Sequence, residues 1–398
     1  MASTVGTSTS SAAVSYHFQR KCFYANGRFW VFYYDGDYLV YRTSTDGETW
    51  SSPTTIGSWA AGVFSLFFDG TYFHYARSGG AGVNLYYRRG KPNADGTITW
   101  SADEQLVLAL EDSNDVIYTP VIAVDSDGYP FIGYVYSDYS AETRYPYITK
   151  SSTNDGTWST ASGFPYLLKN VDSSYWRVIP LRLTGGKMYI LYFYSGANSS
   201  FGRLWTGTMG SEEAVTSSNI SGGRGAATSY GDDVYFCFNE RVAVGEYSLM
   251  FIKRTYGVGW ESEETVKTGI PYDLGPTIGA DPNSGDCYVF WESTSTDHVY
   301  YRKRNADGTW DDVVDWIDES ADGLPTNYYV TSFYEALEGY LGLLYISKTS
   351  SPYNVRFAFL TLVPPAPPLR LPVRNCLSRG GQIRIRSTFH RHLKLKRG

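Results

Sequence analysis

Short apolar stretches alternate with glycine-containing turns along most of the chain. Each repeat has an apolar stretch, a glycine turn, an aromatic stretch, a variable loop and a Tyr-rich stretch that ends in a second turn. The first turns fall at seven glycines, 43 to 58 residues apart: Gly27, Gly70, Gly128, Gly186, Gly231, Gly285 and Gly339. Seven units of about 50 residues match the size of four-stranded propeller blades.

The segments after these turns are rich in aromatic and β-branched residues, a composition that predicts strands. They cover residues 28–34, 71–77, 129–136, 187–194, 234–239, 287–291 and 340–346. No segment has a sustained apolar period of 3.6 residues, so we expect almost no helix. A single blade cannot bury both of its faces, whereas neighbouring blades in a ring cover each other.

The sequence therefore predicts an all-β fold, a seven-bladed β-propeller of four-stranded antiparallel blades. Two packed β-sandwiches are the alternative, and the regular spacing argues against them. We expect a Ser/Thr-rich N-terminal arm at 1–15, the propeller at 16–362, and a Pro-rich linker with a basic tail at 363–398. The segment before Tyr16 is also a candidate for an added strand in the last blade.

Charge divides the chain into two parts. Residues 363–398 contain nine Lys and Arg and no Asp or Glu; the whole chain has a net charge of −6, so the remainder carries −15. An acidic body argues against nucleic acid as the main partner. The basic tail is a candidate attachment segment for an acidic surface.

Composition adds to the prediction of strands, because aromatic residues make up 17% of the chain. The four cysteines have no zinc-binding spacing and indicate buried thiols, so we expect no metal and no cofactor. No stretch reaches the roughly 18 apolar residues of a membrane span. Residues 1–15 show no basic leader region. Asn-x-Ser sequons at Asn198 and Asn219 are compatible with an extracellular or cell-surface location.

Four turns share an Asp-Gly pair followed by Trp: residues 44–50, 93–100, 153–158 and 305–310. Each follows a strand rich in Tyr and Arg. These turns resemble the Asp-boxes of sialidases and other BNR-repeat proteins, and the resemblance covers about residues 16–362. It implies a structural role in which each Asp accepts hydrogen bonds from its own turn and each Trp folds between blades. The residues concerned are Asp46, Trp50, Asp95, Trp100, Asp155, Trp158, Asp307 and Trp310.

The resemblance also implies a ligand-binding bowl at one end of the central channel, where first strands start and second strands end. The first-strand positions are His17, Gln19, Tyr118, Arg177, Arg224, Asp273 and Tyr329. The second-strand positions are Asp35, Arg77, Tyr194, Glu240, Arg241 and Glu292. The phrase at 176–180, Trp-Arg-Val-Ile-Pro, is similar to the Arg-Ile-Pro phrase of sialidases.

In sialidases, three arginines hold the substrate carboxylate, a Tyr/Glu pair supplies the nucleophile and an Asp is the acid. A planar guanidinium suits a carboxylate because it donates two parallel hydrogen bonds. By resemblance, the candidate ligand-binding residues are Arg77, Arg177, Arg224, Arg241, Tyr118 and His17. The candidate catalytic residues are Glu240 or Glu292 with Tyr194 or Tyr329, and Asp273. Surface ion pairs for the arginines and packing for the tyrosines are the alternatives.

Residues 118–128 also resemble a third-blade phrase of polysaccharide lyases with this fold, which include ulvan lyases. Those enzymes use two histidines that flank the phrase. The matching positions here lie near Ile117 and Ser137, so lyase chemistry is disfavoured.

Three functions follow, from different classes. The first is a glycan-binding propeller that recognises saccharides, including acidic sugars, at the channel bowl. The second is a sialidase-like exo-glycoside hydrolase. The third is a structural or adhesive surface protein attached through its basic tail.

Overall fold

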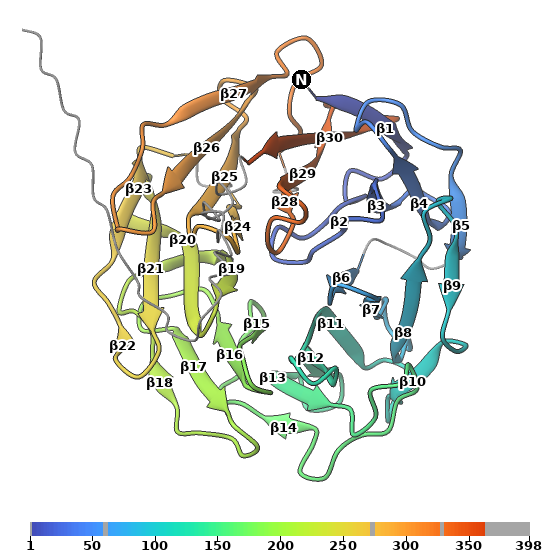
Figure 1. Cartoon of the computed structure of the whole chain (residues 1–398). Helices are drawn as coiled ribbons and strands as arrows, with labels where there is room; N and C mark the ends of the chain where they lie inside the picture. Colours follow the sequence, from blue (N-terminus) through green and yellow to red (C-terminus); the bar gives the residue numbers. More distant parts are fainter. Residues whose placement is uncertain (1, 59–62, 271–274, 327–329, 363–398) are drawn as a thin grey trace, which may run out of the picture. The chain divides into compact units, whose positions relative to one another are not determined.

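A computed structural model describes residues 2–58, 63–270, 275–326 and 330–362. Within these residues there is no helix, and the strands form seven antiparallel sheets arranged as a ring (Figure 1). The prediction of an all-β, seven-bladed propeller is confirmed. Asp273, Tyr329 and the tail at 363–398 lie outside the described residues. No helix in the described part is long and apolar enough to span a membrane.

Each blade has its first strand nearest the channel and its last strand at the outer edge (Figure 1). Blade 1 is β2 (Cys22–Ala25), β3 (Arg28–Tyr34), β4 (Leu39–Ser44) and β5 (Thr54–Gly57). Blade 2 is β6 (Phe64–Phe68), β7 (Phe73–Arg77), β8 (Leu85–Pro92) and β10 (Gln105–Leu108), with β9 (Ile98–Trp100) also paired to β8. Blade 3 is β11 (Val116–Val124), β12 (Pro130–Asp138), β13 (Thr143–Lys150) and β14 (Tyr166–Leu167).

The second half of the ring repeats this order. Blade 4 is β15 (Arg177–Arg182), β16 (Met188–Phe193), β17 (Ser200–Trp205) and β18 (Glu213–Ala214). Blade 5 is β19 (Ile220–Tyr230), β20 (Asp233–Ala243), β21 (Glu246–Thr255) and β23 (Glu264–Thr268), with β22 (Gly259–Trp260) also paired to β21. Blade 6 is β24 (Thr277–Ala280), β25 (Cys287–Ser293), β26 (His298–Arg304) and β27 (Val314–Asp318). Blade 7 is β28 (Thr331–Ser332), β29 (Tyr340–Ser347), β30 (Tyr353–Thr361) and the N-terminal β1 (Ser3–Ser8).

The N-terminal strand closes the ring. β1 pairs antiparallel with β30, so that Ser3 lies opposite Phe357 and Ser8 opposite Tyr353. The outermost strand of the last blade thus comes from the start of the chain. This joins the two ends of the propeller through backbone hydrogen bonds and is the added strand that the sequence nominated before Tyr16.

The seven repeat-defining glycines all lie in the turn between a first and a second strand. Their φ angles are positive, from 59° at Gly231 to 103° at Gly70. Glycine adopts this conformation without a Cβ clash, which explains why the turn position repeats. Because strand direction alternates, these turns lie at one end of the channel, the turn end. First strands start and second strands finish at the other end, the mouth.

The four Asp-Gly turns connect third and fourth strands, so they also lie at the turn end. Oδ1 of Asp46 accepts hydrogen bonds from the amides of Glu48 and Thr49, at 2.8 Å each. In the other three turns, Oδ1 of the Asp accepts the amide two residues on at 2.9 Å. These bonds satisfy backbone amides of the tight turn, so the Asp carboxylates stabilise the fold.

The Trp of these turns packs between blades. Trp158 of blade 3 lies against Tyr87 of blade 2, with ring centroids 5.4 Å apart. Trp310 of blade 6 lies against Phe251 of blade 5 at 5.5 Å. Such aromatic pairs bury a large apolar area at each blade interface and hold neighbouring blades together.

Trp50 and Trp100 serve the interfaces around blade 1. Trp50 contacts Phe357 of blade 7 at 5.3 Å between ring centroids. Trp100 packs on Phe73 at 5.5 Å, in the core cluster that blades 1 and 2 share. The repeat therefore places one bulky ring at each of these blade boundaries.

Candidate ligand-binding site at the channel mouth

The channel is crossed by the guanidinium of Arg20, which lies two residues before β2. Its Nη1 donates to Oγ1 of Thr277 and to Oγ of Ser332, both at 2.8 Å. Its Nη2 donates to the carbonyls of Ala227 and Ile278, at 2.8 and 2.7 Å. These acceptors belong to the first strands of blades 5, 6 and 7. One side chain from blade 1 therefore ties three blades together across the axis.

The neighbours of Arg20 reach the inner strands of blades 2 and 3. Nε2 of Gln19 donates to the carbonyl of Pro120 in blade 3 at 2.8 Å. Nζ of Lys21 donates to the carbonyl of Phe64 in blade 2 and lies 3.7 Å from the centre of its ring. Burial lowers the pKa of Lys21, and it lowers the pKa of Arg20 to about 10. Gln19, Arg20 and Lys21 thus place polar and cationic side chains between the inner strands, and we call these three residues the channel plug.

His17 lies above this plug, toward the mouth, and is 2% exposed. Its Nε2 accepts a hydrogen bond from the amide of Gly225 at 3.1 Å. Nδ1 then carries the proton of the neutral ring, and it has no hydrogen-bond partner among the described residues. Burial lowers the pKa of His17 well below its usual value, and the nearby Arg177 and Arg224 lower it further.

Arg177 begins β15 and reaches the same place. Its Nη1 donates to the carbonyl of Trp176 at 2.8 Å. The guanidinium lies 5.6 Å from the ring centre of Tyr16 and 5.2 Å from that of Phe18. Its Nε is buried and finds no hydrogen-bond acceptor within the described part of the chain. Burial lowers the pKa of Arg177 to about 10, so the group is cationic at neutral pH.

A pocket of about 240 Å³ opens beside Arg177, between blades 3 and 4. Its walls include Tyr118, which is 38% exposed, and Tyr175, which is 51% exposed. The guanidinium of Arg144 also lines it, 5.7 Å from the ring centre of Tyr118. Exposed aromatic faces and two guanidinium groups therefore border one small cavity.

Two first strands are irregular at this end. β11 has a register shift between Tyr118 and Val121, and Thr119 has a φ of 49°. β19 has a register shift between Ile220 and Gly225, which places Arg224 inside the irregular segment. Bulges of this kind redirect side chains and are frequent next to functional sites.

The structure thus brings together four of the nominated residues: His17, Tyr118, Arg177 and Arg224. The nominated Arg77 is engaged elsewhere. It forms an ion pair with Glu104, which precedes the outer strand of blade 2, and stacks 4.2 Å from the ring centre of Tyr86. Arg241 is exposed at the end of β20.

The residues predicted to be catalytic make contacts outside the cluster of His17, Tyr118, Arg177 and Arg224. Glu240 accepts a hydrogen bond from Oγ of Ser218 at 2.6 Å and is part of β20, because this strand is longer than predicted. Tyr194 packs against Trp176, with ring centroids 4.5 Å apart. Glu292 is buried within β25.

Asp35 accepts the amides of Asp37 and Tyr38, at 2.9 and 2.8 Å, and so stabilises its own turn.

The sequence pattern did not point to Tyr16, Arg144 and Tyr175, because they lie beside the strand positions that the pattern marks. Tyr16 immediately precedes His17, Tyr175 lies in the loop before β15, and Arg144 is at the start of a third strand. Third strands also start at the mouth in an antiparallel blade. That geometric rule would have found Arg144.

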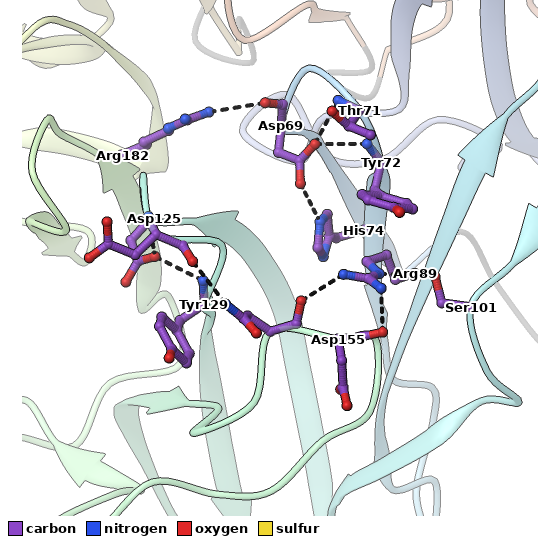
Figure 2. Close-up of polar contacts among 12 residues, drawn as sticks. Asp69, Thr71, Tyr72, His74, Arg89, Ser101, Asp125, Tyr129, Asp155 and Arg182 are labelled. Carbon is purple, nitrogen blue, oxygen red and sulfur yellow. Dashed lines mark hydrogen bonds and ion pairs between the residues drawn. The ribbon is translucent and has the colours of Figure 1, made fainter.

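The turn end also has a cluster of charged and polar residues, shown in Figure 2. The ring of His74 contacts Oδ2 of Asp69 through Nε2, at 3.0 Å, and the hydroxyl of Tyr87 through Nδ1, at 2.9 Å. Asp69 also accepts the amides of Thr71 and Tyr72 at 2.8 and 2.7 Å (Figure 2). Both ring nitrogens of His74 are therefore satisfied.

Arg89 links blade 2, which carries this cluster, to blade 3 by hydrogen bonds. It donates to Oγ of Ser101 at 2.9 Å and to the carbonyls of Asn154 and Asp155 (Figure 2). The acceptors in blade 3 belong to one of the Asp-Gly turns. These hydrogen bonds stabilise the interface between blades 2 and 3.

No protein-family model and no curated protein sequence matches the chain. Solved structures do match it. The BP39L lectin from Burkholderia pseudomallei is 12% identical with a TM-score of 0.56, covering 87% of this chain and 97% of the lectin. The polysaccharide lyase Uly1 is 12% identical with a TM-score of 0.53, covering 88% and 91% of the two chains.

The α-L-arabinofuranosidase Arb93A from Fusarium graminearum is 9% identical with a TM-score of 0.50, covering 90% of this chain and 97% of the enzyme. Sialidases also match, at TM-scores of 0.46 and 0.40. At these identities the matches establish a shared β-propeller fold. Membership of the sialidase-like Asp-box family remains a prediction.

Proposed function

We propose that the protein binds saccharides, and acidic sugars in particular, at the channel mouth. The observation that carries this proposal is the convergence of Arg177, Arg224 and His17 beside an aromatic-lined pocket. Three cationic side chains, Arg177, Arg224 and Arg20, lower the pKa of His17. A carboxylate placed there would offset this positive charge.

The chemistry of each group fits such a ligand. Arg177 has an unused buried Nε, and a guanidinium donates strong hydrogen bonds to a carboxylate. Nδ1 of neutral His17 is a second buried donor without an acceptor in the described residues. Leaving such donors unpaired costs free energy, which a ligand with acceptor oxygens would recover.

The aromatic walls suit the remainder of a sugar. Tyr118 and Tyr175 present exposed rings, against which the C–H face of a pyranose can pack. The solved structures that share this fold include a lectin, a polysaccharide lyase and a glycosidase. Their names are consistent with saccharide recognition. Because function belongs to the site and not to the fold, the proposal depends on the cluster itself.

A glycan array that contains sialylated, uronic-acid and neutral saccharides tests this proposal. We expect binding to acidic saccharides, weakened about tenfold or more in Arg177→Ala because a charge-assisted contact is lost. Lys91→Ala, at an exposed position in β8 of blade 2, is the matched loss of one positive charge and should leave binding unchanged. Acidic-glycan binding that is equal in Arg177→Ala and the wild type would contradict the proposal.

A release assay on fluorogenic sialosides separates binding from hydrolysis. Binding without release identifies a lectin-like propeller. Release that is lost in Arg177→Ala and in Tyr194→Phe would instead identify the alternative, a sialidase-like hydrolase. If the array shows no binding and the sialosides are not hydrolysed, the structural or adhesive role is favoured.

A further inference from the structure

A second pocket opens at the mouth end of the ring, between blades 5 and 6. Its volume is about 510 Å³, more than twice that of the pocket beside Arg177. Blade 5 contributes Lys267 at the end of β23, and blade 6 contributes residues of β25, β26 and the turn between them. This volume lies within the usual range of small-molecule pockets, roughly 300–1,000 Å³.

One wall of the pocket is an aromatic pair. Trp291 of β25 and Tyr300 of β26 lie opposite each other in the strand register. Their rings are nearly parallel, with centroids 5.8 Å apart and an angle of 17° between the planes. Trp291 is 2% exposed and Tyr300 is half-buried, so Tyr300 is the accessible ring and Trp291 packs against it and fixes its position.

Hydroxyl groups line the rim above this pair. Oγ of Ser293 and Oγ of Ser295 are 3.0 Å apart, and Oγ1 of Thr296 is 3.1 Å from the hydroxyl of Tyr300. Each hydroxyl can both donate and accept a hydrogen bond. Ser295 and Thr296 are exposed, so their remaining hydrogen-bonding capacity faces solvent.

The aromatic wall and the hydroxyl rim together match a pyranose ring. The wall suits its apolar C–H face, and the rim suits its polar edge of hydroxyl groups. The negatively polarised face of an aromatic ring attracts such C–H groups. Among the described lining residues, Lys267 is the only one that carries a full charge. This contrasts with the two guanidinium groups at the other pocket and favours a neutral ligand.

We propose that the pocket between blades 5 and 6 is a second saccharide-binding site, selective for neutral sugars. The sugar ring packs on the accessible part of Tyr300, which Trp291 supports from the core side, and its hydroxyls bond to Ser295 and Thr296. The site is separate from the cluster of His17 and Arg177, and it stands even if the latter binds no acidic sugar.

Saturation-transfer NMR on the full chain tests this, with the methyl glycosides of glucose, galactose, mannose, fucose and arabinose as probes. We expect saturation transfer to at least one glycoside in the wild type. Ser295→Trp should abolish it, because an indole at this exposed position fills the pocket without removing a core side chain. Tyr300→Ala should weaken binding about tenfold by removing the accessible aromatic ring.

Two control variants locate the binding. Tyr256→Ala removes an aromatic ring that is 41% exposed in the β21–β22 turn of the same blade 5, and it should leave the signals unchanged. Arg177→Ala should also leave them unchanged, whatever it does to acidic glycans. The proposal is overturned by the absence of signal for every neutral glycoside, by unchanged signals in Ser295→Trp, or by their loss in Arg177→Ala.

Discussion

The two ends of the channel use the same residue types in opposite ways. At the turn end, both nitrogens of His74 are satisfied and Arg89 donates to acceptors in the next blade (Figure 2). At the mouth, His17 and Arg177 are as deeply placed, yet each has a buried nitrogen without a partner among the described residues. His74, with two partners, ties strands of its own blade together, whereas His17 has a donor left over that a group outside the chain can accept.

Electrostatics reinforces this difference. The pKa of His74 is lowered by burial, and the Asp69 carboxylate opposes that shift. The pKa of His17 is lowered by burial and then by Arg177, Arg224 and Arg20. At the turn end a carboxylate faces His74, whereas three arginines act on His17. An acidic ligand would therefore stabilise the mouth and have little effect at the turn end.

Replacement of Arg20 gives the largest expected effect, because this residue separates the two ends. Arg20→Leu removes the donors to the buried carbonyls of Ala227 and Ile278. An unsatisfied buried polar group costs about 1–3 kcal/mol, so we expect a loss of about 2–5 kcal/mol in the free energy of unfolding. Denaturant titration measures it.

The exposed Arg241→Ala is the control and should change stability by no more than about 0.5 kcal/mol. If Arg20→Leu changed stability as little as this control, the plug would not hold the ring together.

A matched pair of histidine substitutions tests the comparison directly. His74→Leu removes one hydrogen-bond partner of the partly buried Asp69 carboxylate and the partner of the buried Tyr87 hydroxyl, and should cost about 2–4 kcal/mol. His17→Leu also leaves the amide of Gly225 unpaired but removes the unsatisfied Nδ1 donor, so about 1 kcal/mol is expected.

Binding should show the reverse order, with acidic-glycan affinity reduced in His17→Leu and retained in His74→Leu. Thermal melts and the glycan array measure both quantities. Equal losses of stability in the two variants would remove the distinction between the ends.

The sequence was sufficient for the fold because the same local requirement recurs in every blade. A glycine with positive φ after each first strand sets the period, and aromatic second strands follow it. The start of a first strand was equally readable, and four residues nominated from it, His17, Tyr118, Arg177 and Arg224, lie near one another in the structure. Their partners depend on the register of strands far apart in the chain.

The ends of second strands were less predictable, since strand lengths vary. β20 runs to Ala243, so Glu240 and Arg241 belong to the strand and do not follow it. Arg77 ends β7 as expected, but its side chain turns toward Glu104 at the outer edge of its blade. Arg20 gave no local signal at all, because its acceptors in blades 5, 6 and 7 are more than 200 residues away.

The smallest expected effect concerns two glutamates near the mouth end of blade 5. Oγ of Ser218 lies 2.6 Å from Glu240 and 2.8 Å from Glu263. One hydroxyl proton cannot fully serve two carboxylates, so this geometry favours a protonated carboxyl on one of them. Burial raises the pKa of Glu263, and the charge of Glu240 raises it further.

A carboxyl whose pKa is higher in the fold than in the unfolded chain stabilises the fold at low pH, and that contribution is lost as pH rises through the folded pKa. Glu263→Gln keeps the shape of the protonated group and removes its titration. We therefore expect this variant to lose less stability than the wild type between about pH 4, near the pKa of an unfolded glutamate, and pH 7. Denaturant titrations across this range measure the difference, with the exposed Glu246→Gln as the matched control. Parallel pH profiles for wild type and Glu263→Gln would show that the Glu263 carboxyl titrates as it does in the unfolded chain, and the contact that it shares through Ser218 would then hold no proton on it.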